Sequence, residues 1–124
     1  MIRLQEIRIG NLLTPPDGTL VYVDEITRNI IKCKSFNGVD YWMDSTHDWS
    51  IPLNDEWLYT FGFERFGEPH EIFKRHAFVV KILHTRLILE TSPFEFEIKS
   101  VHQLQNLHFD LVGEDLAYTR DIMP

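Results

Sequence analysis

Ser100-Val-His-Gln-Leu-Gln-Asn-Leu-His-Phe-Asp-Leu-Val-Gly113 is the stretch that decides the fold, because the start, the buried side and the end of a helix can all be read from it. Ser100 and Gln103 have the spacing of a capping box, in which each side chain accepts a hydrogen bond from a backbone N–H. Gly113 can adopt the left-handed conformation that often ends a helix. The pattern predicts a helix with five apolar residues in the core: Val101, Leu104, Leu107, Leu111 and Val112.

The sequence before this helix predicts an antiparallel β-meander. Residues 77–83 and 86–91 are rich in apolar and β-branched residues, as strands are. Phe94, Phe96 and Ile98 then alternate with charged residues, the period-2 pattern of a strand with one face in water. We expect the C-terminal helix to cover the buried face of this meander.

Residues 9–53 predict short strands separated by turns. Pro15-Pro-Asp-Gly18 and Asn37-Gly38 both have the composition of tight turns, and Asn37-Gly38 is the strongest hairpin signal in the chain. The spacing of these turns predicts a small, bent antiparallel β-module. An SH3-like barrel is one alternative for it.

A short helix is expected to join the two parts of the chain. Asn54 is a good N-cap, acidic residues follow it, and Gly62 supplies a stop. The predicted fold class is therefore α+β. It has an N-terminal β-module over residues 1–53, and residues 54–124 hold the short helix, the meander and the C-terminal helix. Aromatic residues such as Trp57 predict that the two parts share one core.

Composition limits the class of protein. The chain has 124 residues, 44% of them hydrophobic and 13% aromatic, which suits a globular protein that needs no disulfide or metal to fold. Cys33 is the single cysteine and has no internal partner. No apolar run approaches the roughly 20 residues of a membrane span, and the N-terminus lacks an apolar signal core. We therefore expect a cytoplasmic protein without membrane association.

The formal net charge of −7 is unevenly distributed. Residues 1–43 hold five Lys and Arg residues and five Asp and Glu residues, so the whole negative excess lies in residues 44–124. Phosphate neutralisation dominates nucleic-acid affinity, and an acidic surface opposes it. The charge pattern disfavours a nucleic-acid partner, except for weak binding through the neutral first part.

The sequence contains no motif that defines a reaction or a metal site. There is no Gly-x-Ser-x-Gly elbow, phosphate loop or dinucleotide fingerprint. His102 and His108 are six residues apart, which places them about 120° apart around a helix and prevents shared ligation of one ion. We expect no metal and no cofactor, and we predict a non-enzymatic protein. An unrecognised small hydrolase remains an alternative.

Two groups of residues are candidates for binding a partner. His102, Gln105 and Phe109 lie together on a flank of the apolar face of the C-terminal helix. They either bind a partner or hydrogen-bond to a neighbouring strand, as half-buried polar side chains must, and we favour the structural role. Trp42 and Trp49 flank a polar loop, where aromatic rings either pack in the core or bind a peptide or bases. The expected function is an interaction module for an unidentified protein partner, with a weak nucleic-acid module as the alternative.

Three segments together resemble a known family. They are Ile7-Arg-Ile-Gly-Asn-Leu-Leu13, Ile51-Pro-Leu-Asn-Asp-Glu-Trp-Leu58 continuing into Phe61-Gly-Phe63, and Val101-His-Gln-Leu-Gln-Asn-Leu107 continuing through Gly113-Glu-Asp-Leu116. The family consists of small uncharacterised proteins of Gram-negative gut anaerobes and of their phages and prophages. The resemblance implies an accessory protein of a phage or mobile element, and it brings no activity, cofactor or catalytic residue with it.

Overall fold

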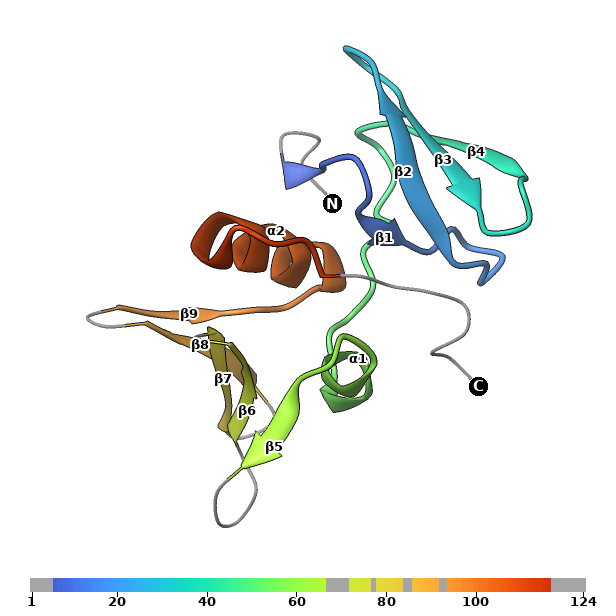
Figure 1. The fold of residues 1–124 in the computed structure, drawn as a ribbon. Coiled ribbons are helices and arrows are strands. Elements are labelled where there is room, and N and C mark those ends of the chain that lie inside the picture. The colour runs from blue at the N-terminus through green and yellow to red at the C-terminus, as the bar shows by residue number, and fades with distance from the viewer. Residues whose placement is uncertain (1–5, 67–71, 77, 84–85, 92–93, 117–124) are drawn as a thin grey trace. The chain divides into compact units, whose positions relative to one another are not determined.

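A computed structural model describes residues 6–66, 72–76, 78–83, 86–91 and 94–116. The chain divides into two compact units, Met1–Ile51 (unit 1) and Pro52–Pro124 (unit 2). Within the described residues there are two antiparallel sheets, of four and five strands, and two helices (Figure 1). The predicted α+β class is thereby confirmed, whereas a core shared by both parts of the chain stays a prediction.

Unit 1 is a single antiparallel sheet in the order β1-β2-β3-β4. The turn at Asn37-Gly38 joins β3 to β4, as predicted, and Gly38 has φ 91°. A register shift between Val23 and Glu25 marks a β-bulge, which bends a strand. The described strands do not close into the SH3-like barrel considered above, because β1 and β4 remain separate edges of the sheet. The strands are β1 (Leu12–Leu13), β2 (Val21–Ile26), β3 (Ile31–Ser35) and β4 (Asp40–Met43).

The core of unit 1 lies on one face of this sheet. Alternate residues of β2 and β3 are buried, as expected for strands with one face in water. Trp49, from the segment after β4, joins the same cluster. The clustered side chains are Ile7, Leu13, Val21, Val23, Ile31, Cys33, Met43 and Trp49.

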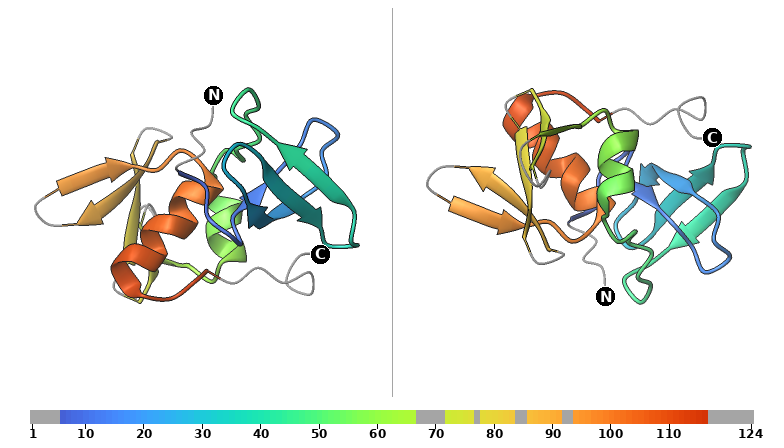
Figure 2. Two further views of the ribbon diagram at one scale, coloured as in Figure 1. Left: turned by 90° about the horizontal axis from the view of Figure 1, so that it is seen from above. Right: turned by 90° about the horizontal axis from the view of Figure 1, so that it is seen from below.

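Unit 2 begins with helix α1 (Asp55–Thr60), whose N-cap Asn54 accepts a hydrogen bond from Trp57 N. Leu58 on this helix is fully buried, whereas Trp57, expected in the core, is half-buried. A five-stranded antiparallel meander follows in the order β5-β6-β7-β8-β9. Figure 1 labels these strands, and Figure 2 gives two further views of the ribbon. The strands are β5 (Glu64–Phe66), β6 (Ile72–Arg75), β7 (Phe78–Leu83), β8 (Arg86–Thr91) and β9 (Phe94–Glu97).

Helix α2 (Val101–Val112) has the ends that the sequence predicted. The Ser100 side chain accepts a hydrogen bond from Gln103 N, and Gln103 Oε1 accepts one from Lys99 N. Gly113 ends the helix in the left-handed conformation, with φ 85°. Neither α2 nor α1 has the length and apolar character needed to cross a membrane, within the part of the chain that the structure describes.

Replacing Ser100 by alanine is expected to lower the free energy of unfolding by about 1 kcal/mol, because Gln103 N loses its side-chain acceptor. Ser100→Asp is the matched control, since aspartate caps as well as serine does. Urea unfolding of the three proteins measures the effect. Equal midpoints for Ser100→Ala and wild type would show that the cap contributes nothing.

The buried side of α2 differs from the prediction. Val101 and Leu104 are fully buried, as expected, but Leu111 is 56% exposed. His108 is 0% exposed and takes the place that Leu111 was expected to fill. The physical reason is that both ring nitrogens of His108 have hydrogen-bond partners, so burial of this polar side chain does not leave it unsatisfied.

The predicted inner face of β9 needs a similar correction. Ile98, just after the strand, is 2% exposed, but Phe96 is 49% exposed. Phe96 lies on the edge strand, which has a neighbour on one side only. Glu97, expected on the wet face, has a side chain that is 30% exposed, so the burial of Phe96 and Glu97 does not follow the predicted alternation.

Candidate partner-binding groove

Of the three partner-binding candidates on α2, two are buried and one is exposed. His102 and Gln105 are 3% and 9% exposed, whereas Phe109 is 46% exposed. Little of the His102 and Gln105 side chains is therefore accessible to a partner. Their burial is the condition that the structural role requires.

The two candidate tryptophans also differ in burial, since one is buried and the other is exposed. Trp49 is 7% exposed and packs in the unit 1 core, with its ring edge-on to Tyr41 at 6.5 Å and stacked on His47 at 5.3 Å. Trp42 is 57% exposed on edge strand β4, directly across from Lys32. Burial makes Trp49 a packing residue, and only Trp42 of the pair offers a ring to solvent.

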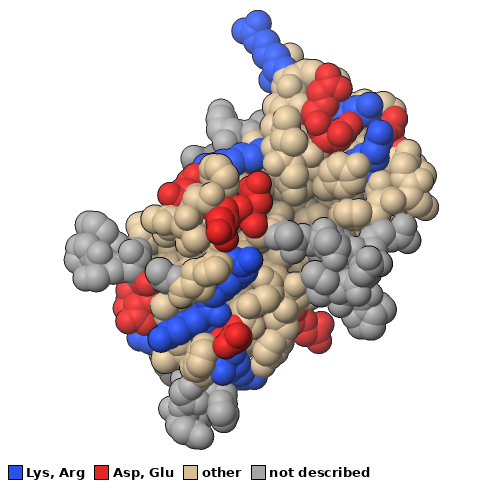
Figure 3. Space-filling view, viewed as in Figure 1, with Lys and Arg blue, Asp and Glu red and all other residues tan. Residues whose placement is uncertain are grey.

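Basic residues of unit 1 lie close to acidic ones. Lys32 Nζ lies 3.9 Å from Asp40 Oδ2, and Lys34 is the cross-strand partner of Asp40. On the face drawn in Figure 3, Lys and Arg side chains are interspersed with Asp and Glu side chains. The described residues of unit 1 therefore show no strip of unopposed positive charge on this face, which phosphate binding would favour.

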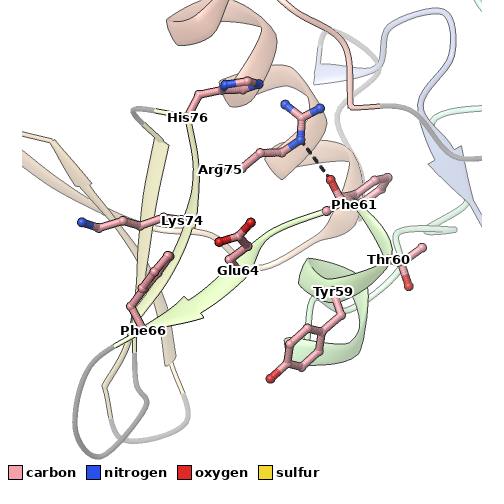
Figure 4. A pocket seen from close by; sticks show the side chains of 9 residues that line it. Tyr59, Thr60, Phe61, Glu64, Phe66, Lys74, Arg75 and His76 are labelled. Carbon is pink, nitrogen blue, oxygen red and sulfur yellow. Dashed lines mark hydrogen bonds between the residues drawn. The ribbon is translucent and has the colours of Figure 1, made fainter.

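Unit 2 contains a groove between α1 and the β5–β6 hairpin, with a volume of about 680 Å³ (Figure 4). This volume falls within the range of about 300–1,000 Å³ that is typical of ligand pockets. Its lining combines aromatic, charged and small residues: Tyr59, Thr60, Phe61, Gly62, Glu64, Phe66, Lys74, Arg75 and His76. None of these residues was a candidate in the sequence analysis. The segment Phe63-Glu-Arg-Phe66, directly after the Gly62 stop, has its two apolar residues three positions apart, so it lacks the period-2 signal that would have revealed this strand.

Arg75 fixes one side of the groove. Its Nε donates a hydrogen bond of 3.0 Å to the carbonyl of Phe61, at the end of α1. Its Nη1 lies 3.4 Å from Nε2 of His108 on α2 and 3.8 Å from a carboxylate oxygen of Glu114. One guanidinium thus links α1, β6 and the segment that follows α2, which makes this wall rigid.

The tautomer of His108 follows from its partners. Nδ1 lies 2.8 Å from the carbonyl oxygen of Glu114, which can only accept, so Nδ1 carries the proton. Nε2 is then free to accept from Arg75. Burial lowers the pKa of His108 below its ordinary value of 6.5, and the positive charges of Arg75 and His76 add to this effect, while the Glu114 carbonyl opposes it. The ring is therefore neutral at pH 7.

The remaining charged groups of the groove lie on the wet face of the sheet. Lys74 Nζ sits over the Phe66 ring at 5.7 Å, and Figure 4 shows the Lys74 side chain pointing away from Phe61. The carboxylate of Glu64 is directed into the space between Lys74 and Phe61 (Figure 4). Within the described residues, no ion pair or hydrogen bond engages this carboxylate.

Reactive groups are few at this groove. The Thr60 hydroxyl donates to the carbonyl of Glu56, so it is held in the helix rather than offered to a substrate.

The thiol of Cys33 lies in the unit 1 core, and burial raises its pKa to about 11. A thiol with such a pKa is a poor nucleophile at pH 7. The described residues contain no group of three or more His, Cys, Asp and Glu side chains that could hold a metal ion.

Comparisons with known proteins add no family to these observations. No protein-family model, no curated protein and no solved structure matches the chain. The fold and the groove define an α+β protein with an open, partly aromatic groove on its five-stranded unit.

Proposed function

We propose that the chain is a non-enzymatic interaction protein and that the groove between α1 and the β5–β6 hairpin binds a segment of a protein partner. The observation that carries this proposal is the combination of volume and exposed aromatic rings. Tyr59 and Phe66, both in the lining, are 48% and 44% exposed. Aromatic side chains of this kind contribute much of the binding energy at protein interfaces.

The polar groups of the groove support binding rather than catalysis. The Arg75 guanidinium is engaged by Phe61, His108 and Glu114, and the Thr60 hydroxyl by Glu56. A nucleophile within hydrogen-bond reach of a base is the usual mark of covalent catalysis. The contacts of Arg75 and Thr60 serve instead to hold the walls of the groove, as a preorganised binding surface requires.

Selection from a library of phage-displayed random peptides on the intact chain tests this function. Enriched peptides are expected to bind wild type and to lose about tenfold in affinity on Phe66→Ser, because a central aromatic contact is removed. Trp42→Ser is the matched control, since Trp42 is also exposed but lies in unit 1. Loss on Trp42→Ser with no loss on Phe66→Ser would move the site to unit 1, and a selection without enriched peptides would count against a peptide-binding function.

The biological setting that we propose follows from the resemblance stated above. An accessory protein of a phage or mobile element is expected to be encoded among phage genes. Inspection of the neighbouring genes checks this, and a location within a conserved metabolic operon would argue against it.

A further inference from the structure

Strand β4 is an open edge of the unit 1 sheet. It pairs with β3 on one side only, in a register without a bulge (Figure 1). The N–H of Ser35 donates to the carbonyl of Val39 at 2.8 Å, so Val39 directs its carbonyl toward β3. Since successive residues of an antiparallel strand alternate in this respect, Asp40 and Trp42 direct their N–H and C=O groups away from β3. Within the described residues, no hydrogen bond engages these four groups.

The two edges of this sheet differ in how far they are open. Strand β1 has only two residues, and the N–H of Thr14, which follows it, donates to the carbonyl of Trp49 at 2.8 Å. Strand β4 has neither a proline nor a bulge, two devices by which proteins block an edge strand. Its one charged side chain, Asp40, lies 3.9 Å from the ammonium of Lys32. Strand β4 is therefore the edge of unit 1 that another strand can extend.

We propose that β4 pairs antiparallel with β4 of a second copy of the chain, which joins two four-stranded sheets into one of eight strands. The two-fold axis passes beside Tyr41, so Asp40 of each copy lies opposite Trp42 of the other. Each outward N–H then meets an outward C=O, and four backbone hydrogen bonds form. The edge is thus complementary to itself, as a two-fold interface requires. This inference concerns unit 1 and does not depend on the groove of unit 2.

The charged residues around β4 select this register. A pairing centred on Asp40 would set two carboxylates opposite each other, and one centred on Trp42 would set Asp40 opposite Asp44. Like charges directly opposite each other destabilise a strand pair. The pairing centred on Tyr41 avoids both, because Asp40 faces the Trp42 ring. Residues 1–43 also hold equal numbers of basic and acidic residues, so the two sheets meet without a net charge on this part of the chain.

Sedimentation equilibrium and NMR of the intact chain test the proposal. We expect a monomer–dimer equilibrium with a Kd on the order of 100 µM, because a contact between two short strands belongs to the small, weak class of interfaces. A mixture of equal parts of ¹³C-labelled and unlabelled chain then locates the contact. An intermolecular NOE between the Hα atoms of Tyr41 in the two copies is expected, since facing residues outside the hydrogen-bonded pairs have Cα atoms about 4.5 Å apart.

Two substitutions of Trp42 separate backbone pairing from contact of the ring. Trp42→Pro removes an outward N–H from each copy, and an edge strand accepts proline where the lost donor faces away from its neighbour. This variant is expected to dimerise at least about tenfold more weakly, because two hydrogen bonds are lost. Trp42→Thr is the matched control, since it removes the ring but keeps the N–H and a β-branched side chain. Its Kd should rise by no more than about threefold.

The other results would overturn the proposal. Equal losses for the two variants would assign the contact to the Trp42 ring rather than to the strand edge. A chain that stays monomeric at about 1 mM, tenfold above the expected Kd, would exclude the dimer. Monomers whose β4 amides shift only with an added foreign peptide would give the edge to a different partner. If Trp42→Pro does not fold, the wild-type NOE decides, and intermolecular NOEs confined to unit 2 would place the contact elsewhere.

Discussion

Phe73→Ala is expected to lower the free energy of unfolding of unit 2 by about 4 kcal/mol, the largest effect that we predict for this chain. Phe73 lies on β6 and is 0% exposed. Tyr59 packs edge-on against its ring at 5.3 Å, and the Arg65 guanidinium lies 5.2 Å from the ring centroid. Removal of the ring leaves a cavity where α1, β5 and β6 meet, and these elements also carry the groove. The variant should therefore lose groove binding as well as stability.

Hydrogen exchange of the β6, β7 and β8 amides in increasing urea measures the stability of unit 2 without assuming that both units unfold together. Phe96→Ala is the matched control, because Phe96 belongs to the same sheet but is 49% exposed. Its expected cost is below about 1 kcal/mol, since an exposed ring leaves no cavity. Similar losses for the two variants would contradict the burial that separates them.

Acidification is expected to destabilise unit 2 through His108. The pKa of this residue is lowered in the folded chain by burial, so the unfolded chain takes up a proton first as the pH falls. The contribution of His108 to stability is complete above pH 6.5, the ordinary pKa of histidine, and is lost as the pH falls from there through the folded pKa. Protonation would also place a proton on Nε2, facing the guanidinium of Arg75, and so disrupt that contact.

His108→Asn isolates this effect. An asparagine amide can still donate to the Glu114 carbonyl, but it does not titrate, and it leaves Arg75 without its ring acceptor. We expect a loss of about 2 kcal/mol at pH 7.5 and a flatter dependence of stability on pH below 6.5. His47→Asn serves as the control, because the His47 side chain is 43% exposed and belongs to unit 1. An unchanged pH dependence in His108→Asn would show that another group is responsible.

Local chemistry made the ends of the helices predictable. Ser100, Gln103 and Gly113 act on backbone groups within a few residues of themselves, so their roles follow from the sequence alone. The same holds for Asn54 at the start of α1 and for the turn at Asn37-Gly38. The strand pattern between these signals was sufficient to predict an antiparallel α+β fold.

The candidate site was not predictable in this way. The groove combines residues 59–62 with residues on two strands, and its walls depend on Arg75 reaching both Phe61 and His108. Contacts between residues 14 and 33 positions apart leave no periodic trace in the sequence. The aromatic and histidine candidates were chosen by residue type, and type does not distinguish the exposed Trp42 from the buried Trp49.

The sequence by itself determined where the helices begin and end, most of the strands but not β5 and β6, and the excess of negative charge. Only the tertiary structure decided which side of α2 is buried. Leu111 is the more apolar choice, but His108 is the residue that is enclosed, because Arg75 and the Glu114 carbonyl satisfy both of its nitrogens. A buried polar group is tolerated when its hydrogen bonds are made, and those partners exist only once the chain has folded.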